Sequence, residues 1–210
     1  GDVEHVAPPQ WLTAAQDQKE KGEPIEPQFN VNGPLLMRSV PKPIIAALNG
    51  PAVGFGLTFA LGCDIRIASE KATLGAVFVR VGLTPEFGGT YNLAQLVGVA
   101  KACELVFSGQ IIDAQEALKI GLVNQVVPAE KLKAVTYELA TTIAEGPPLA
   151  IALAKKALYQ SQHVDLATQI PFERYSVKVC RDSQDHMEGV RAFIEKRKPK
   201  FQGRLGWLPF

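Results

Sequence analysis

Residues 42–64 read KPIIAALNGPAVGFGLTFALGCD, and this stretch decides the fold that the sequence predicts. Its apolar middle part carries no charge, a pattern that also occurs in membrane-spanning helices. An Asn-Gly-Pro cluster at 49–51 interrupts the run, however, and two more glycines follow almost at once. The cluster therefore favours a strand over residues 43–48, a tight turn, and a short buried helix that begins at Gly54.

The glycine-rich turn before this helix places backbone N–H groups where they can bind an anion. A second strand is predicted over residues 64–68, so strand, turn, helix and strand form one unit. The first N–H groups of a helix have no acceptor within it, and they carry a partial positive charge. The start of the helix therefore predicts a site for a phosphate, or for an oxygen that becomes negative during a reaction.

The bulk composition fits a folded protein with a buried core. The chain has 210 residues, of which 47% are hydrophobic, and a formal net charge of +1. This length predicts one domain, or one domain with an appendage. The balanced charge gives no indication of general binding to nucleic acid or membrane surfaces. Residues 191–204 hold six basic residues and one glutamate, which either a solvated tail or an anion-binding tail explains.

The cysteines and histidines indicate a reducing compartment and no metal site. Cys63, Cys103 and Cys180 lie far apart and include no C-x-x-C pair, so we expect reduced thiols. The three histidines do not have the spacing of metal ligands. The N-terminus lacks the basic start and apolar centre of a signal peptide. We therefore expect a cytoplasmic protein without a metal or a bound cofactor.

The pattern along the chain predicts an α/β core followed by helices. Residues 1–41 are polar and proline-bearing, with room for one helix over 12–21. The region after residue 41 alternates strands and helices, and the pattern is helical from residue 129 to the end. We therefore expect a core over 1–128 and a helical region over 129–210. Helix starts are predicted at Thr90, at Asp113 with its capping box to Glu116, at Pro147-Pro148, and at Ser183.

Several motifs in these segments resemble the crotonase (enoyl-CoA hydratase/isomerase) superfamily. They are IAALNGPAVG at 45–54, CDIRIA at 63–68, Gly88-Gly89-Thr90, Ser108-Gly109 with AQEALKIGLV at 114–123, and EGVRAFIEKR at 188–197. The resemblance covers about residues 41–203. It implies an α/β fold, a spiral of ββα units with a helical C-terminal trimerisation region. It also implies an acyl-CoA thioester substrate, in which coenzyme A is part of the substrate, and a homotrimer or a dimer of trimers.

The resemblance implies an oxyanion hole made of two backbone N–H groups that stabilise a thioester enolate. One donor falls on Phe55, where the varying side chain does not matter because only the N–H is used. The family motif that ends in Gly1-Asp2 implies that the second donor, and the N-terminal part of the usual domain, precede Gly1. Losing one such donor costs about 3–4 kcal/mol of transition-state stabilisation. The implied substrate-binding positions are Gly1, Asp2, Gly54, Thr58 and Phe78.

The acid/base residues argue against an ordinary hydratase. The two glutamates that hydratases of this family share fall here on Thr58 and Phe78, neither of which moves a proton usefully. Glu86, in TPEFG, is similar to the single catalytic glutamate of one branch of enoyl-CoA isomerases. One base suffices for isomerisation, because it takes a proton from C2 and returns it to C4. A surface-loop glutamate is the other interpretation of Glu86.

Two further alternatives remain open from the sequence. The chain could be a non-catalytic acyl-CoA-binding homologue, because both hydratase glutamates are replaced. It could also be a hydratase, hydrolase or decarboxylase variant, since some family members work with few acid/base groups. Lys196 and Arg197, in the basic C-terminal run, are implied as weak candidates for contacts with the CoA phosphates.

Overall fold

Two successive strand-strand-helix turns build the part of the fold that surrounds the quoted stretch. The computed structural model describes residues 33–203. The first turn consists of β1 (Ile45–Leu48), β2 (Ala52–Val53) and α3 (Phe55–Gly62). The second consists of β3 (Ile65–Ser69), β4 (Thr73–Gly75), the 3-10 helix η2 (Val77–Val81) and α4 (Gly89–Val97). α2 (Gly33–Ser39) precedes them.

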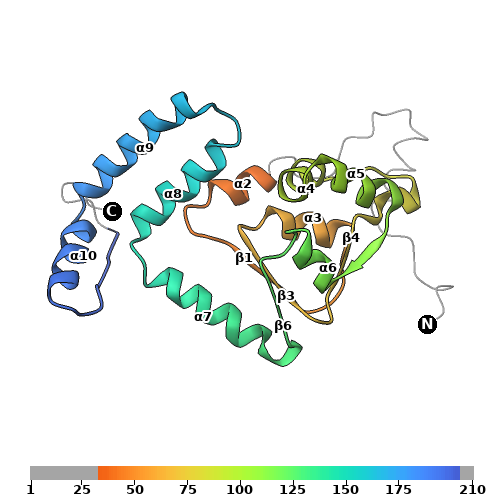
Figure 1. Ribbon diagram of the computed structural model, residues 1–210, viewed down its shortest axis with the longest axis horizontal. Helices are drawn as coiled ribbons and strands as arrows, with labels where there is room; N and C mark the ends of the chain where they lie inside the picture. The colour runs from red at the N-terminus through yellow and green to blue at the C-terminus, as the bar shows by residue number, and fades with distance from the viewer. Residues whose placement is uncertain (1–32, 204–210) are drawn as a thin grey trace, which may run out of the picture. The chain divides into compact units, whose positions relative to one another are not determined.

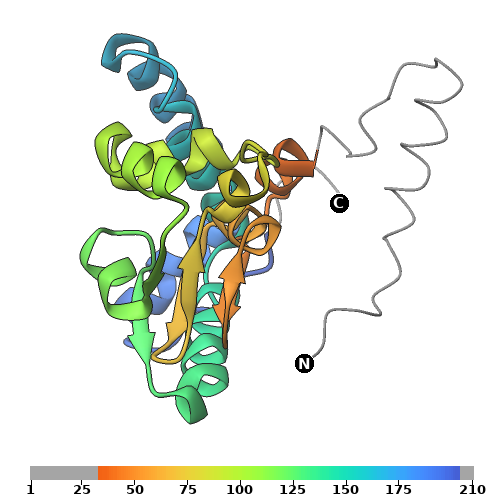
Figure 2. The same cartoon turned by 90° about the vertical axis from the view of Figure 1, so that its right-hand side faces the viewer.

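Each turn contributes one strand to each of two sheets, which is the arrangement of a spiral. β1 pairs in parallel with β3, and β2 pairs in parallel with β4. β6 (Gln125–Val127) extends the first sheet in parallel, and β5 (Ile111–Asp113) closes the second in antiparallel fashion. Figures 1 and 2 show β1 and β3 side by side. The predicted α/β spiral is therefore confirmed.

Gly54 makes the sharp passage from β2 into α3. Its φ of 56° and ψ of −125° lie in a region that residues with a Cβ rarely adopt. Its N–H donates to the Gly75 carbonyl at 3.0 Å, so the turn is tied to the end of β4. The glycine at this position thus allows the chain to reverse while the start of α3 stays fixed to the second sheet.

The core lies around α3, which is apolar on most of its surface. Leu57 and Leu61 of this helix pack with Leu74 of β4, Leu93 of α4 and Leu122, all of them nearly inaccessible to solvent. Burying one leucine side chain contributes roughly 1.5–3 kcal/mol, so this cluster is a major source of stability. It also holds α3 rigidly against its neighbours, and so positions the start of the helix.

The remaining elements are mostly helical, as predicted. They are α5 (Val99–Ser108), α6 (Ala114–Lys119), η3 (Ala129–Lys131), α7 (Leu132–Ala144), α8 (Pro148–Gln160), α9 (Leu166–Arg181) and α10 (Gln184–Ile194). Within the described part of the chain, every regular element after residue 128 is a helix. The domain boundary proposed at this residue stays a prediction. Among residues 33–203, no helix has the length and apolar character needed to cross a bilayer.

Local details both confirm and correct the predictions. The Asp113 carboxylate accepts the Glu116 N–H at 2.8 Å, and the Ser183 hydroxyl accepts the His186 N–H at 3.2 Å, so both are caps. The prediction for Thr90 was wrong, because Gly88 precedes the helix and Thr90 lies inside its first turn. α2 was not predicted, and the helix expected over 12–21 lies outside the described residues.

Candidate functional site

The start of α3 presents free backbone donors at the surface. The Gly54 carbonyl accepts the N–H groups of Leu57 and Thr58 at 3.1 and 3.2 Å. No acceptor within residues 33–203 pairs with the N–H groups of Phe55 and Gly56. Within the described part of the chain, two donors of this helix N-terminus therefore have no partner, and a helix N-terminus attracts negative charge. Phe55 itself is 46% exposed.

The loop that carries Glu86 is held against this end of α3 at two points. On one side, Gly89 packs so closely on Thr58 that a Cβ added at Gly89 would overlap the Thr58 methyl group. On the other side, the ring of Phe87 lies edge-to-face on the ring of Phe55, with 5.3 Å between centroids. The Glu86 carbonyl also accepts the Gly89 N–H at 2.8 Å. These contacts hold the backbone that follows Glu86 against the first turns of α3.

Phe87 adopts a strained backbone conformation. Its φ is +54°, in the left-handed region that bulky residues avoid. A non-glycine residue in this region costs on the order of 1–2 kcal/mol. The ring contacts with α3 compensate for the strain, which indicates that the turn after Glu86 is shaped by its packing on α3.

Three phenylalanines form what we call the phenylalanine cluster: Phe55, Phe59 and Phe87. The Phe55 and Phe59 rings lie 6.1 Å apart, and the Phe59 and Phe87 rings lie 5.7 Å apart. Phe59 is 48% exposed, like Phe55. The sulphur of Met37, on α2, lies 3.0 Å from where a side chain on Gly62 would begin. Met37 and Phe87 thus cover Gly62, which is buried, and the exposed part of this apolar surface is formed by Phe55 and Phe59.

Two predicted substrate-binding residues lie inside the core. Thr58 is 1% exposed, and its hydroxyl donates to the Phe55 carbonyl at 3.1 Å. Phe78 is 7% exposed, and its carbonyl accepts the Leu83 N–H at 3.0 Å at the base of the Glu86 loop. Both residues shape the site from behind, and their direct contact with a substrate stays a prediction. Gly1 and Asp2 lie outside the described residues.

The two basic residues predicted for the CoA phosphates have different surroundings. The Arg197 guanidinium binds both oxygens of Glu188, at 2.6 and 3.0 Å, and Glu195 at 2.6 Å. The hydrogen bonds from Arg197, followed by that from the Lys200 N–H, lower the pKa of Glu188 to about 2. Arg197 is thus engaged in ion pairs that it would have to exchange for a phosphate. The role proposed for Lys196 stays a prediction.

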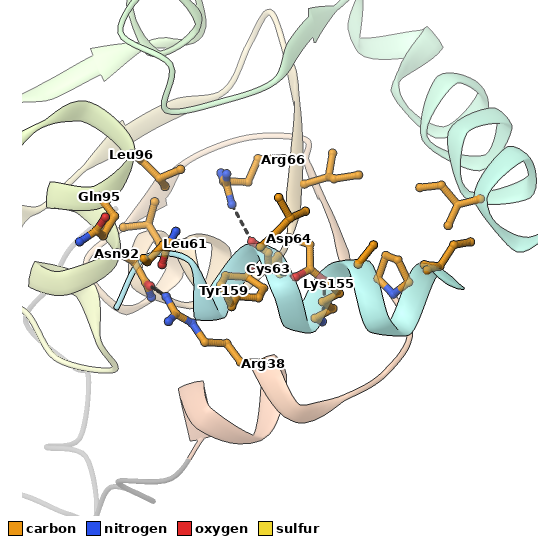
Figure 3. A pocket seen from close by; sticks show the side chains of 17 residues that line it. Arg38, Leu61, Cys63, Asp64, Arg66, Asn92, Gln95, Leu96, Lys155 and Tyr159 are labelled. Atoms are coloured by element: carbon orange, nitrogen blue, oxygen red, sulfur yellow. Dashed lines mark hydrogen bonds and ion pairs between the residues drawn. The ribbon is translucent and has the colours of Figure 1, made fainter. Parts of the chain in front are cut away.

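A buried polar cluster at the other end of α3 was not predicted from the sequence. Asp64 accepts hydrogen bonds from Lys155 Nζ, from the Tyr159 hydroxyl and from the Ile44 N–H, each at 2.7 Å. Lys155 Nζ also donates to the carbonyls of Met37 and Lys42, at 3.2 and 3.3 Å. Figure 3 shows Asp64, Lys155 and Tyr159 at a cavity of about 490 Å³. We call these three residues the Asp64 cluster.

The groups of the Asp64 cluster are already paired with one another. Burial, followed by the hydrogen bond to Asp64, raises the pKa of Tyr159 to about 12, so its proton is held at neutral pH. Arg66, buried beside the same cavity, donates to the carbonyls of Leu122 and Cys63 at 2.9 and 2.6 Å. Because the carboxylate and the ammonium satisfy each other, the cluster joins α8 to α3 and supplies no free base.

The family model described as "Enoyl-CoA hydratase/isomerase" matches residues 13–204. The short-chain-enoyl-CoA hydratase of Clostridium acetobutylicum is 45% identical over 157 residues, which cover 75% of this chain and 60% of the relative. The 2,3-dehydroadipyl-CoA hydratase of Escherichia coli is 41% identical over 163 residues, which cover 78% of this chain and 64% of the relative. The chain thus spans less than two thirds of the length of these relatives.

A solved structure is similar at the level of the fold as well. The crystal structure of an enoyl-CoA hydratase from Bacillus anthracis superposes with a TM-score of 0.80 at 40% sequence identity. The match covers 81% of this chain and 66% of that structure. The spiral of the two sheets is therefore shared with a protein of known structure.

Proposed function

Because the chain belongs to the enoyl-CoA hydratase/isomerase family, we propose that it processes an acyl-CoA thioester and shifts a double bond of the acyl chain with one carboxylate, Glu86. One observation carries the proposal. The loop that carries Glu86 packs on the first turns of α3 through two residues that follow Glu86 in the chain, Phe87 on Phe55 and Gly89 on Thr58. Glu86 carries the only carboxylate of residues 82–88, and this supports its choice as the base.

The reaction requires the transfer of one proton from C2 to C4 by a single base. Glu86 removes a proton from C2 of a 3-enoyl thioester, and the electrons move to the thioester oxygen as an enolate. The Phe55 N–H donates to this oxygen, and the positive end of α3 adds to the stabilisation. The carboxylic acid of Glu86 then returns the proton to C4, so the product is the conjugated 2-enoyl thioester and the base is regenerated. A second donor, which the resemblance puts just before Gly1, belongs to the same proposal.

Hydration is the second candidate function. The relatives that match the chain carry names of hydratases, and this favours water addition. Against it stands the nature of the side chains behind the site: Thr58 donates its hydroxyl to the backbone, and Phe78 has no acid/base group. In a hydratase reaction Glu86 alone would have to activate the water. A third candidate function is acyl-CoA binding without turnover, and the absorbance assay described below distinguishes it from both reactions.

The proposal extends to the surroundings of the enzyme. The chemistry requires no metal and no cofactor besides the coenzyme A of the substrate. Cys63, Cys103 and Cys180 are free thiols, in line with a cytoplasmic location. We also propose a homotrimer or a dimer of trimers. The side chain of Phe193 on α10 is 85% exposed, and a large exposed apolar side chain supports a subunit interface at this helix.

The test compares Glu86→Gln with Glu130→Gln, which neutralises an exposed glutamate of η3. Isomerisation of a 3-enoyl-CoA raises the ultraviolet absorbance of the conjugated thioester, whereas hydration of a 2-enoyl-CoA lowers it. We expect Glu86→Gln to reduce the isomerisation rate by roughly 100- to 10,000-fold, because it removes the general base. Acyl-CoA binding and the Glu130→Gln rate should stay near wild type.

Two results would contradict the proposal. Undiminished isomerisation by Glu86→Gln would show that another group moves the proton. Hydration without isomerisation in the wild-type protein would establish the second candidate instead. If neither substrate is turned over while acetoacetyl-CoA binds, the chain is a binding homologue.

A further inference from the structure

The cavity beside the Asp64 cluster lies at the opposite end of α3 from the proposed reaction site. Leu61 and Cys63, at the end of this helix, line the cavity, whereas Phe55 and Glu86 do not. Its volume of about 490 Å³ is within the range of sites that bind small molecules. Leu158 of α8 is 70% exposed at its wall, so the cavity opens to solvent. A small ligand can therefore enter it.

Much of the cavity wall is aliphatic. The branched aliphatic side chains come from α3, β3, α4, α7 and α8, and they are Leu61, Ile65, Leu96, Ile143, Ile151 and Leu158. Each methylene group of a ligand that leaves water against such a wall adds to the affinity. The cavity therefore suits a ligand with an apolar body.

The charged side chains of the wall carry a surplus of positive charge. Arg38, Arg66 and Lys155 are cationic, and Asp64 is the one acidic side chain among the lining residues (Figure 3). The Lys155 ammonium has three N–H donors, and the Asp64 carboxylate and two carbonyls accept all of them. Lys155 and Asp64 thus satisfy each other, and the two arginines provide the surplus.

Arg66 is a buried cation without an acidic partner among residues 33–203. Its side chain is only 4% exposed, and the carbonyls of Leu122 and Cys63 accept two of its five N–H groups. No carboxylate of the described residues forms an ion pair with it. Burial lowers the pKa of Arg66, as expected for a cation removed from water. An anion in the adjacent cavity would compensate this charge.

Arg38 reaches the cavity from α2 and presents hydrogen-bond donors there. Its guanidinium carbon lies over the rings of Tyr91 and Tyr159, at 5.0 and 4.6 Å from their centroids. Such stacking uses the flat face of the guanidinium and leaves the N–H groups at its edge available. Within residues 33–203, only the Asn92 side chain accepts one of these N–H groups, at 2.5 Å. The planar fork of an arginine matches the two oxygens of a carboxylate.

We propose that this cavity binds a small organic carboxylate with an aliphatic body. Arg38 binds the carboxylate, Arg66 adds positive potential in surroundings of low dielectric constant, and the aliphatic wall takes up the body. The inference does not depend on the proposed function, because neither Phe55 nor Glu86 lines the cavity.

Titration calorimetry on the full chain tests the site with octanoate as the probe. Octan-1-ol has the body without the charge, and we expect it to bind roughly 10- to 100-fold more weakly. Acetate has the charge without the body and should bind at least about 100-fold more weakly. Octylammonium carries the wrong charge and should not bind. Saturating acetoacetyl-CoA should leave the affinity for octanoate unchanged, because the thioester site is separate.

Two variants locate the binding. Arg38→Met removes the guanidinium and should weaken octanoate binding roughly 10- to 100-fold, to the level of octan-1-ol. Arg174→Met, the same change at an exposed arginine of α9 outside the cavity, should bind as wild type. Circular dichroism checks that both fold.

Ala154→Phe fills the cavity without changing its charge. Ala154 is an exposed residue of the wall on α8, so the larger side chain is compatible with folding and serves if Arg38→Met is unfolded. It should abolish octanoate binding. Ala134→Phe, at an exposed alanine of α7 outside the cavity, is its matched control and should leave the affinity within two-fold.

Several outcomes would overturn the inference. They are an absence of octanoate binding, equal affinity for octanoate and octan-1-ol, and displacement of octanoate by acetoacetyl-CoA. Unchanged binding in a folded Ala154→Phe variant would also refute the site. A protein that binds octanoate as described but turns over no enoyl-CoA would support this inference while refuting the proposed reaction, so the two fail separately.

Discussion

Gly89 decides how closely the Glu86 loop approaches α3. A methyl group there would meet the Thr58 methyl and lie 3.3 Å from the Pro85 side chain. We predict that Gly89→Ala destabilises the fold by about 1–3 kcal/mol and slows turnover, because overpacking pushes the loop away. Denaturant unfolding and the absorbance assay measure the two effects.

Thr58→Ser provides the matched second variant for this contact. It removes the methyl group and keeps the hydroxyl that donates to the Phe55 carbonyl. Combined with Gly89→Ala, it should recover part of the lost stability, so the double variant should be more stable than the sum of the two single changes indicates. Strict additivity would show that the contact does not set the position of the loop.

Lys155 compensates a carboxylate that is largely removed from water. Its side chain is 7% exposed and that of Asp64 is 15% exposed. Lys155→Ala leaves this charge without its partner, and we predict a loss of about 3–5 kcal/mol in the free energy of unfolding. Tyr159→Phe removes one hydrogen bond and should cost about 1–2 kcal/mol.

Lys178→Ala is the control for the Asp64 cluster, because Lys178 is an exposed lysine of α9 whose side chain makes no ion pair or cation–π contact within residues 33–203. Its effect should stay within about 0.5 kcal/mol, as for most surface substitutions. Chemical denaturation monitored by circular dichroism compares the three variants. A similar loss in both lysine variants would refute the role of the ion pair.

At the scale of single residues, the sequence predicts roles for residues that lie in local motifs. The roles predicted for Phe55 and Glu86 follow from the resemblance of the residues around them to motifs of the family, and they stay predictions. Lys155 and Tyr159 lie 91 and 95 positions from Asp64, and nothing near any of the three announces the contact. Their apolar-looking helix, KKALYQ at 155–160 with its preceding alanines, gives only a helical signal.

At the scale of elements, Glu188 joins α10 to the segment that follows this helix. Glu188 on this helix pairs with Arg197 beyond its end and accepts the Lys200 N–H at 2.8 Å. Because the folded pKa of Glu188 is about 2, below the ordinary 4.5, its contribution to stability is complete above pH 4.5. It is lost as the pH falls from about 4.5 towards 2, where the folded-state carboxylate takes up its proton.

We therefore predict that Glu188→Gln weakens the dependence of stability on pH between 4.5 and 2. The measurement is urea unfolding at several pH values, with Glu130→Gln as the control. Wild type and control should lose stability across this window, and the Glu188→Gln variant should lose less. Parallel curves for all three proteins would contradict the assignment.

Elements could be predicted where one pattern dominates. β1, α3 and β3 follow from an apolar run that glycines divide, and their positions agree with the sequence within two residues. β4 ends at Gly75 and η2 begins at Val77, a change from strand to 3-10 helix that no single sequence pattern indicates. Gly98, with φ of 77°, separates α4 from α5.

At the scale of the whole molecule, the exposed apolar residues of the last helices bear on assembly. On α10, Phe193 and Ile194 are 85% and 73% exposed, and on α9 Leu166 is 73% exposed. We predict that Phe193→Asp shifts the protein to smaller species in sedimentation equilibrium, because a charge in a subunit interface is unfavourable. Glu130→Gln should sediment as wild type. An unchanged mass for Phe193→Asp would exclude α10 from the interface.

The spiral could be predicted for the molecule as a whole only through its motifs. Strand lengths of two to five residues carry little pattern of their own, and β2 consists of Ala52 and Val53 alone. Pairing with β4 in the second sheet makes β2 a strand, and that partner lies more than twenty residues further on. Tertiary contacts thus decide what propensity leaves open.

The Asp64 cluster has a consequence for the order of folding. Its ion pair closes a loop of 91 positions, and contacts of such separation form slowly because the entropy of closure must first be overcome. During synthesis, Asp64 leaves the ribosome long before Lys155 exists. The carboxylate therefore stays hydrated while the early strands assemble, and α8 neutralises it only on docking. Docking of α8 thus removes this charge from water only after the earlier strands have been synthesised.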